Sequence, residues 1–366
     1  MFRKTLRMTL LALLATATLG RVALAQDPQD QFGDTIDVNE VALDVLVTDS
    51  KGNVIVGLEP GDFRVTENGK PVELTGLTFY SNRRLVESSP ALAKKGVEAG
   101  AATEDRYFIL LIDDQKENAV DAPRLLSQQL EAAKRAKGWI DGELLPNDWV
   151  AVTSYDTKLK VQQDFTRDKK ALIAAVDAAV KGKDPEGNYP SRVKAGSGPS
   201  LLAGLPKGKE LRAKTPTIWE GLQQIARSAG NIRGRKNLLL FTGGLPGRIN
   251  TFGQYVPDPR YARPTANALN DSNVAIYALD LVPAGTEHTL SSALNDLADQ
   301  TGGRYFYNFT NFSTPLDQIA KENNGYYLLS YRSEHPAGAK GFQEVDVKAN
   351  NPEFRIKVRK GYEYGE

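Results

Sequence analysis

The sequence contains no cysteine, and this absence excludes several kinds of chemistry. Without thiols the chain forms no disulfide and no thiolate zinc site, has no cysteine nucleophile, and cannot be anchored by a lipid on cysteine. A chain of 366 residues is long enough to bury a sizeable core without disulfide support. Its length favours two domains.

Histidine is also scarce, which narrows the possible catalytic machinery. The only two histidines, His288 and His335, lie in polar stretches, and we expect both to be solvated. Neither the G-x-S-x-G nor the H-E-x-x-H motif is present, and the glycine- and lysine-rich segments 204–209 and 230–236 do not fit a phosphate-binding loop. We therefore predict that the protein is not an enzyme.

Excess charge of one sign is missing as well. The chain has 46 basic and 45 acidic side chains, a formal net charge of +1. Such a balance creates no positive electrostatic field that would attract a phosphate backbone. A nucleic acid is therefore not an expected partner.

The amino terminus has the features of an export signal. A basic start precedes the apolar run 8–19, and small residues lead up to Ala25. The apolar run is shorter than the roughly 20 residues that span a bilayer. We predict a signal peptide at 1–25, cleaved after Ala25, and a secreted or periplasmic product without stable membrane insertion.

Both ends of the remaining chain show β-patterns. Residues 34–80 alternate apolar and polar side chains around an Asn68-Gly69 hairpin turn. Segments 343–349 and 354–360 alternate too, and they predict a C-terminal hairpin within 340–362. Because neither group can bury its apolar face alone, we predict that they pair in one small β-sandwich. Residues 81–105, polar and rich in small residues, are predicted to be a linker.

Between these ends, 106–331 alternates strand and helix patterns. Apolar runs of strand length occur at 107–112, 148–155, 237–242, 273–280 and 304–307. Helical patterns occur at 169–180, 217–229, 291–300 and from a predicted cap at Thr314. This alternation predicts an α/β domain with a doubly wound, mostly parallel sheet. The apolar segment 326–331 is expected to close that sheet, and 182–213 to form a long surface excursion.

Six segments carry a resemblance to a known family: VLVTDSKGNVIVGLEPGDFRVTENGKPVEL, RYFILLIDD, NLLLFTGG, NVAIYALD, LADQTGGRYF and YYLLSYR…EFRIKVRKGY. Together they resemble the von Willebrand factor type A-related exported proteins common in acidobacteria. The resemblance implies a type A domain with a central, mostly parallel sheet. It also implies that the chain binds a protein, often through a divalent cation, but it supplies no particular partner.

In open α/β sheets, ligands bind beyond the carboxyl ends of the strands. The candidate binding residues at this edge are Asp113, Asp114, Gln115, Glu117, Thr217, Thr242, Gly243 and Asp280. The metal-ion-dependent adhesion site of the family uses D-x-S-x-S, a threonine and a second aspartate, all oxygen ligands for a hard cation.

The match to that adhesion site is incomplete. Asp113 and Thr217 match their positions, whereas Gln115 and Glu117 replace the serines and Gly243 replaces the second aspartate. We therefore predict a degenerate site and no cofactor. If an ion is bound, Mg²⁺ or another divalent cation is the candidate, with Asp113, Glu117 and Thr217 as ligands.

Three functions stay open at this point. The first is a non-catalytic binding module with a protein partner of unknown identity. The second is a cation-dependent adhesion domain with a working metal site. The third is a periplasmic hydrolase that uses the carboxylates of Asp113 and Asp114, although adjacent strand residues point to opposite faces. Among the aromatic residues of 304–312, part are expected to lie in the core, and Phe309 or Phe312 is the better candidate for contact with a partner.

Overall fold

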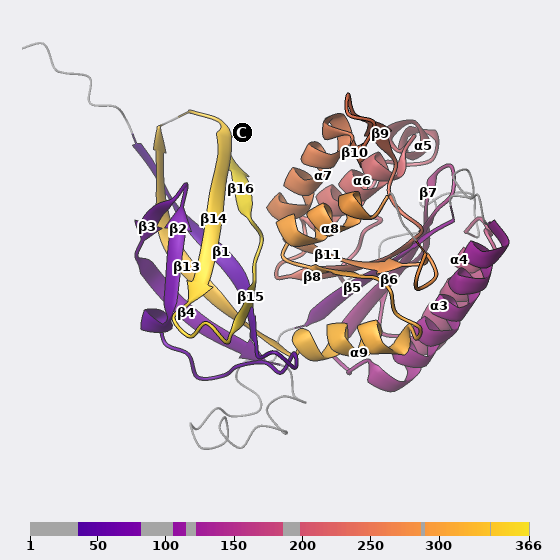
Figure 1. Cartoon of the computed structure of the whole chain (residues 1–366), viewed down its shortest axis with the longest axis horizontal. Coiled ribbons are helices and arrows are strands. Elements are labelled where there is room, and N and C mark those ends of the chain that lie inside the picture. Colours follow the sequence, from indigo (N-terminus) through magenta and orange to yellow (C-terminus); the bar gives the residue numbers. More distant parts are fainter. Residues whose placement is uncertain are drawn as a thin grey trace, which may run out of the picture.

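The computed structural model describes residues 36–81, 105–114, 122–185, 198–286, 290–336 and 338–365. The predicted signal peptide, most of the predicted linker, and Gln115 and Glu117 lie outside these residues. Strands and helices form an α/β unit, and strands from both ends of the chain form a β unit beside it (Figure 1).

The α/β unit is built on a six-stranded sheet in the order β12-β11-β8-β5-β6-β7. Neighbouring strands run parallel except β6 and β7, so the sheet is mostly parallel, as predicted. Its strands are β5 (Arg106–Asp113), β6 (Asp148–Tyr155), β7 (Leu159–Thr166), β8 (Lys236–Thr242), β11 (Val274–Asp280) and β12 (Arg304–Phe306). A separate two-stranded ribbon comprises β9 (Gly247–Ile249) and β10 (Tyr255–Pro257).

Helices cover both faces of this sheet. One face packs against α6 (Ile218–Ala229), α7 (Pro259–Asp271) and α8 (Ser291–Gln300), and the other against α3 (Ala122–Glu143), α4 (Lys169–Val180) and α9 (Ser313–Glu322) (Figure 1). The run at β5 shows why: Ile109 and Leu111 enter one core, while Phe108 and Leu110 enter the other. A strand buried on both faces needs such an uninterrupted apolar run.

The β unit consists of two four-stranded sheets, in the orders β15-β1-β13-β4 and β16-β14-β2-β3. Both contribute to one apolar core. The strands are β1 (Ile36–Thr48), β2 (Phe63–Glu67), β3 (Lys70–Val72), β4 (Leu74–Ser81), β13 (Gly325–Pro336), β14 (Gly341–Ala349), β15 (Arg355–Lys357) and β16 (Gly361–Tyr364). A short 3-10 helix, Pro60–Asp62, precedes β2. Strands far apart in sequence therefore pair, β1 with β13 and β2 with β14.

The structure differs from the predictions for the C-terminal strands. Segment 326–331 belongs to β13, which pairs with β1 and β4 rather than closing the parallel sheet. Burial alternates along β13 from Tyr327 to His335, which suits a strand with one buried face. The predicted hairpin of 343–349 and 354–360 is also wrong, because β14 and β15 lie in different sheets.

Two further expectations fail. Residues 198–213 are not a surface excursion: Leu201, Leu205 and Leu211 are buried in the core beside α6, and the short helix α5 covers Lys209–Lys214. Thr314 does not cap α9, which begins at Ser313 without a side-chain cap. In both places the packing of apolar residues outweighs the structure that the local composition favours.

The β unit joins the α/β unit at the amino ends of the parallel strands. There the buried Glu322 accepts from Arg304, at the start of β12, and from Lys357 of β15. Asn273, just before β11, donates to Asp44 of β1. A Cβ at Gly302 would lie 2.5 Å from the backbone carbon of Val358, so only glycine allows this approach.

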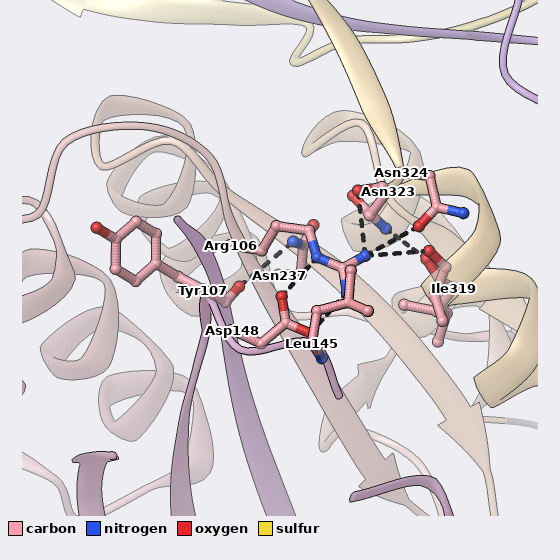
Figure 2. A network of polar contacts seen from close by, with 9 residues as sticks. Arg106, Tyr107, Leu145, Asp148, Asn237, Ile319, Asn323 and Asn324 are labelled. Atoms are coloured by element: carbon pink, nitrogen blue, oxygen red, sulfur yellow. Dashed lines mark hydrogen bonds and ion pairs between the residues drawn. The ribbon is translucent and has the colours of Figure 1, made fainter. Parts of the chain in front are cut away.

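A second buried network holds the same edge together (Figure 2). Arg106, the first residue of β5, binds both carboxylate oxygens of Asp148, at 2.7 and 2.6 Å. Its other nitrogen, Nη1, donates to the carbonyl of Asn323 and the side chain of Asn324, between α9 and β13. This edge of the sheet is therefore closed by ion pairs and by the β unit.

Candidate functional site

Three of the candidate residues end neighbouring strands at the opposite, carboxyl edge. Asp113 ends β5, Thr242 ends β8 and Asp280 ends β11, and Thr242 pairs in register with Asp280. The Thr242 hydroxyl lies 2.5 Å from Oδ2 of Asp113. All three side chains are buried at the base of the edge.

Thr242 fixes the loop that follows β8. Its Oγ1 accepts from the backbone N–H of Gly244 at 3.0 Å, and its carbonyl accepts from the N–H of Leu281 at 2.9 Å. The hydroxyl therefore joins the end of β5 to the turn after β8. This polar link between the strand ends forms the floor of the candidate site.

Asp280 is held by partners of its own. Its Oδ1 accepts from the N–H of Val282 at 2.8 Å, and its Oδ2 accepts from the Tyr305 hydroxyl at 2.6 Å. Burial, and next the hydrogen bond to Asp280, raise the pKa of Tyr305. Tyr305 therefore stays protonated and acts as a donor to the carboxylate across the physiological range.

Asp113 and Asp114 face different neighbours. The backbone N–H of Asp114 donates to the carbonyl of Tyr155 at 2.7 Å, and its Oδ2 lies close to Gly182, after the end of α4. Asp113 instead faces Thr242 on β8. The two carboxyl groups thus point away from each other, as expected for adjacent strand residues.

Thr217 has a structural task at the start of α6. Its Oγ1 lies 3.0 Å from Oε2 of Glu220 and accepts from the Glu220 N–H at 3.4 Å, while Glu220 accepts from the Thr217 N–H. This is a capping box, which satisfies two N–H groups of the first turn. The Thr217 hydroxyl is therefore engaged within its own helix.

The described residues fit a divalent cation poorly. Gly243 has no side chain that could bind a cation. The Thr217 hydroxyl caps α6, and the Asp113 carboxylate already accepts a hydrogen bond from Thr242. Within the described ranges, no group of three or more acidic or histidine side chains is placed to hold a metal ion. Glu117, the third proposed ligand, and the candidate binding residue Gln115 lie outside the described residues.

The predictions from the sequence did not include the exposed apolar residues of this edge. The ribbon of β9 and β10 follows β8 and carries Ile249 and Phe252, which are 71% and 87% exposed. After β12 it is Tyr307, 64% exposed, that stands in solvent. Phe312 is buried, which argues against it as a contact residue, whereas Phe309 is half-buried and packs against it. Phe312 precedes α9 and joins the core that this helix covers.

Two smaller points concern the histidines and the membrane. His335 is buried and stacks on Tyr364 with 4.4 Å between ring centroids, so it is not solvated as expected. His288 lies outside the described residues. Across the part of the chain that the structure describes, no helix combines the length and the apolar character needed to cross a membrane.

Comparisons with known proteins give only distant matches. No family model and no curated protein matches the sequence. Similar solved structures include the conserved hypothetical protein BatB from Bacteroides thetaiotaomicron (14% identity, 59% of this chain and 96% of that chain, TM-score 0.38). Others are manganese-loaded TRAP protein from Plasmodium vivax (13%, 70% and 94%, 0.37) and VWA2, an ArnB paralog from Sulfolobus acidocaldarius (10%, 89% and 76%, 0.34). Matches this weak assign no function to the chain.

Proposed function

We propose that this protein is an exported, non-catalytic binding module. The α/β unit is a von Willebrand factor type A-like domain inserted between the two parts of a small β-sandwich. It contacts a protein partner with the carboxyl edge of its parallel sheet. Residues 1–25 are removed as a signal peptide.

One observation supports this proposal most directly. The large apolar side chains that stand exposed among the described residues all follow the carboxyl end of a parallel strand. Leu126 and Leu130 lie on α3 after β5, Ile249 and Phe252 after β8, and Tyr307 after β12. Exposed apolar side chains that share one edge of a sheet indicate a protein-binding surface, whereas exposed apolar side chains scattered singly do not.

The turn that carries Phe252 is well ordered by its own hydrogen bonds. The Asn250 side chain accepts from the N–H groups of Phe252 and Gln254, both at 2.9 Å. The Gly253 N–H donates to the Asn250 carbonyl at 3.0 Å, and Gly253 has a φ of 77°. Such a turn loses little conformational entropy on binding, which suits an anchor residue.

Binding is proposed to be independent of a metal ion. The Asp113 carboxylate, which would be the first ligand of a cation site, faces the Thr242 hydroxyl. The Thr217 hydroxyl caps α6. The separation of Asp113 from Asp114 also argues against a hydrolase, since paired carboxylates have to face one substrate.

Site-specific photocrosslinking in the organism that makes the protein tests the proposal. A photoreactive residue is placed at Phe252, at Leu130, and at the exposed Glu353 of the β unit as a control. We expect discrete crosslinked products with one protein from positions 252 and 130, and none from 353. Ile249→Ser should abolish the product formed from position 130. Equal labelling from all three positions, or none from any, would contradict a specific protein partner at this edge.

A further inference from the structure

A separate cavity lies beside the strand ends, between the loop after β11, the start of α8 and the residues after β12. Its volume is about 680 Å³. Its floor is Asp280 and Tyr305, and its rim includes Tyr307 and Asn308. The chemistry of the residues that line the cavity limits the kinds of ligand that can bind there.

The aromatic wall is a pair of tyrosine rings. Tyr305 and Tyr307 stack with 5.1 Å between centroids and 17° between planes. Tyr305 is fixed by its hydrogen bond to Asp280, and Tyr307 stands largely in solvent. A fixed inner ring therefore supports an outer ring that offers a flat apolar surface.

The polar walls carry both donors and acceptors. Hydroxyl groups come from Thr286, Ser291 and Ser292, and amides from Asn295 and Asn308. Asn308 adopts a φ of 53°, and its Oδ1 accepts from the Gly285 N–H at 2.9 Å, so its amide nitrogen points away from that loop. Hydroxyl and amide groups suit a ligand whose own groups both donate and accept.

Charge narrows the choice further. Among the described residues that line the cavity, Asp280 is the single charged one, and it disfavours a phosphate or carboxylate ligand. The first turn of α8 lies at the opposite wall, and its positive end disfavours a cation. A purely apolar ligand would make no use of the hydroxyl and amide groups of these walls. A neutral ligand rich in hydroxyls, with one apolar face, satisfies all these walls.

We infer that this cavity binds a saccharide, with the C–H face of one sugar ring stacked on Tyr307 and its hydroxyls hydrogen-bonded to Asn295, Asn308 and the serines of α8. This is a second binding activity beyond the proposed protein-binding function. It uses the stacked tyrosines, of which Tyr307 is also one of the exposed apolar side chains of this edge, whereas the protein contacts tested above lie on the β9–β10 ribbon and α3. The two ligands would meet the same edge of the sheet at different places.

Saturation-transfer NMR on residues 26–366 tests the inference with a panel of free sugars: glucose, galactose, mannose, N-acetylglucosamine and cellobiose. We expect transfer to the ring C–H protons of at least one sugar. Tyr307→Ala should weaken that binding at least about fivefold, because it removes the stacking surface. Tyr307→Phe, which keeps the ring, should bind within about twofold of the unchanged protein.

Two controls keep the outcomes distinct. Phe252→Ala removes another exposed aromatic ring, outside the cavity, and should leave sugar binding unchanged. Asn295→Ala, at an exposed residue that lines the cavity, should weaken it. Thermal melts of each variant check that the fold is kept. No transfer to any sugar would overturn the inference, as would transfer that persists in Tyr307→Ala. A Tyr307-dependent signal from N-acetyl-argininamide alone would show a cation site instead.

Failure here leaves the protein-binding proposal standing, because photocrosslinking at 252 and 130 does not involve the cavity. Conversely, sugar binding without a crosslinked protein would retain the saccharide site and remove the protein partner.

Discussion

The two edges of the parallel sheet differ in what lies against them. At the amino edge, the buried Arg106–Asp148 ion pair joins β5 to β6, while Glu322 and Gly302 contact residues of the β unit. At the carboxyl edge, short polar links hold the strand ends, and exposed apolar side chains stand on the segments beyond them. Buried ion pairs thus lie at one edge and exposed apolar side chains at the other, and substitutions can test what each contributes.

The largest effect is expected at the amino edge. Asp148→Ala leaves the Arg106 guanidinium buried without its carboxylate, since the two side chains are only 10% and 0% exposed. Removing one partner of such a pair costs about 3–5 kcal/mol of unfolding free energy. Urea unfolding measures this loss. Asp346→Ala, which breaks the exposed pair with Lys348, should cost less than about 1 kcal/mol. Similar losses in both variants would refute the closed-edge interpretation.

The next effect depends on pH and concerns Lys236, the buried first residue of β8. Burial lowers its pKa from 10.5 to about 8, against the opposing attraction of Asp44. Between these two values the unfolded chain binds more protons than the folded chain, so stability rises with pH in this window. Its charged form is therefore a cost at neutral pH.

Lys236→Met should remove that cost. We expect the variant to be more stable than the unchanged protein by about 3 kcal/mol at neutral pH, and the gain to shrink as the pH rises above 8. Unfolding free energies of both proteins at several pH values check this. A difference that does not change with pH would show that Lys236 does not titrate in the window.

A smaller effect is expected at the carboxyl edge. Thr242→Val keeps the shape of the side chain but removes the hydroxyl that faces Asp113 and accepts from Gly244. The loss should be about 2 kcal/mol, because the hydrogen bond involves a carboxylate. Thr75→Val, the same change at an exposed hydroxyl, should alter stability by less than about 0.5 kcal/mol. Equal stability of Thr242→Val and the unchanged protein would mean that this link contributes nothing.

The smallest effect is expected from metal ions. A cation that binds only the folded chain at a hundredfold excess over its dissociation constant would add about 2.7 kcal/mol. For metal-independent binding we expect no change in Tm with Mg²⁺, Mn²⁺ or Ca²⁺ relative to EDTA. A clear rise in Tm that vanishes in Asp113→Ala would instead establish the cation-dependent alternative.

The sequence predicts the α/β unit best where a strand is buried on both faces. The run at 148–155 predicts β6 to the residue, because its length and its β-branched and aromatic side chains suit a buried strand. β13 shows the limit: its apolar residues suit either sheet, and only the partner strand β1, far away in sequence, decides between them. The sequence pattern did not predict helix α7, because this helix contains Pro259 and Pro264.

The candidate site was predictable in outline only. The shared edge of Asp113, Thr242 and Asp280 follows from the chain order of parallel strands. The direction of each hydroxyl and the exposure of Phe252 and Tyr307 do not, because both depend on packing by residues elsewhere. The turn residues Asn250 and Gly253 were the one available indication of the β9–β10 ribbon.

The pairing of β1 with β13 has a consequence for biosynthesis. β1 is among the first segments of the described chain to be made, yet its central neighbour is made only after the whole α/β unit. Until then β1 and β2 expose apolar faces and unpaired edges, which chaperones and proteases recognise. A polypeptide that ends anywhere between β4 and β13 lacks β13 and β14, the later partner strands of β1 and β2, so its β unit cannot close.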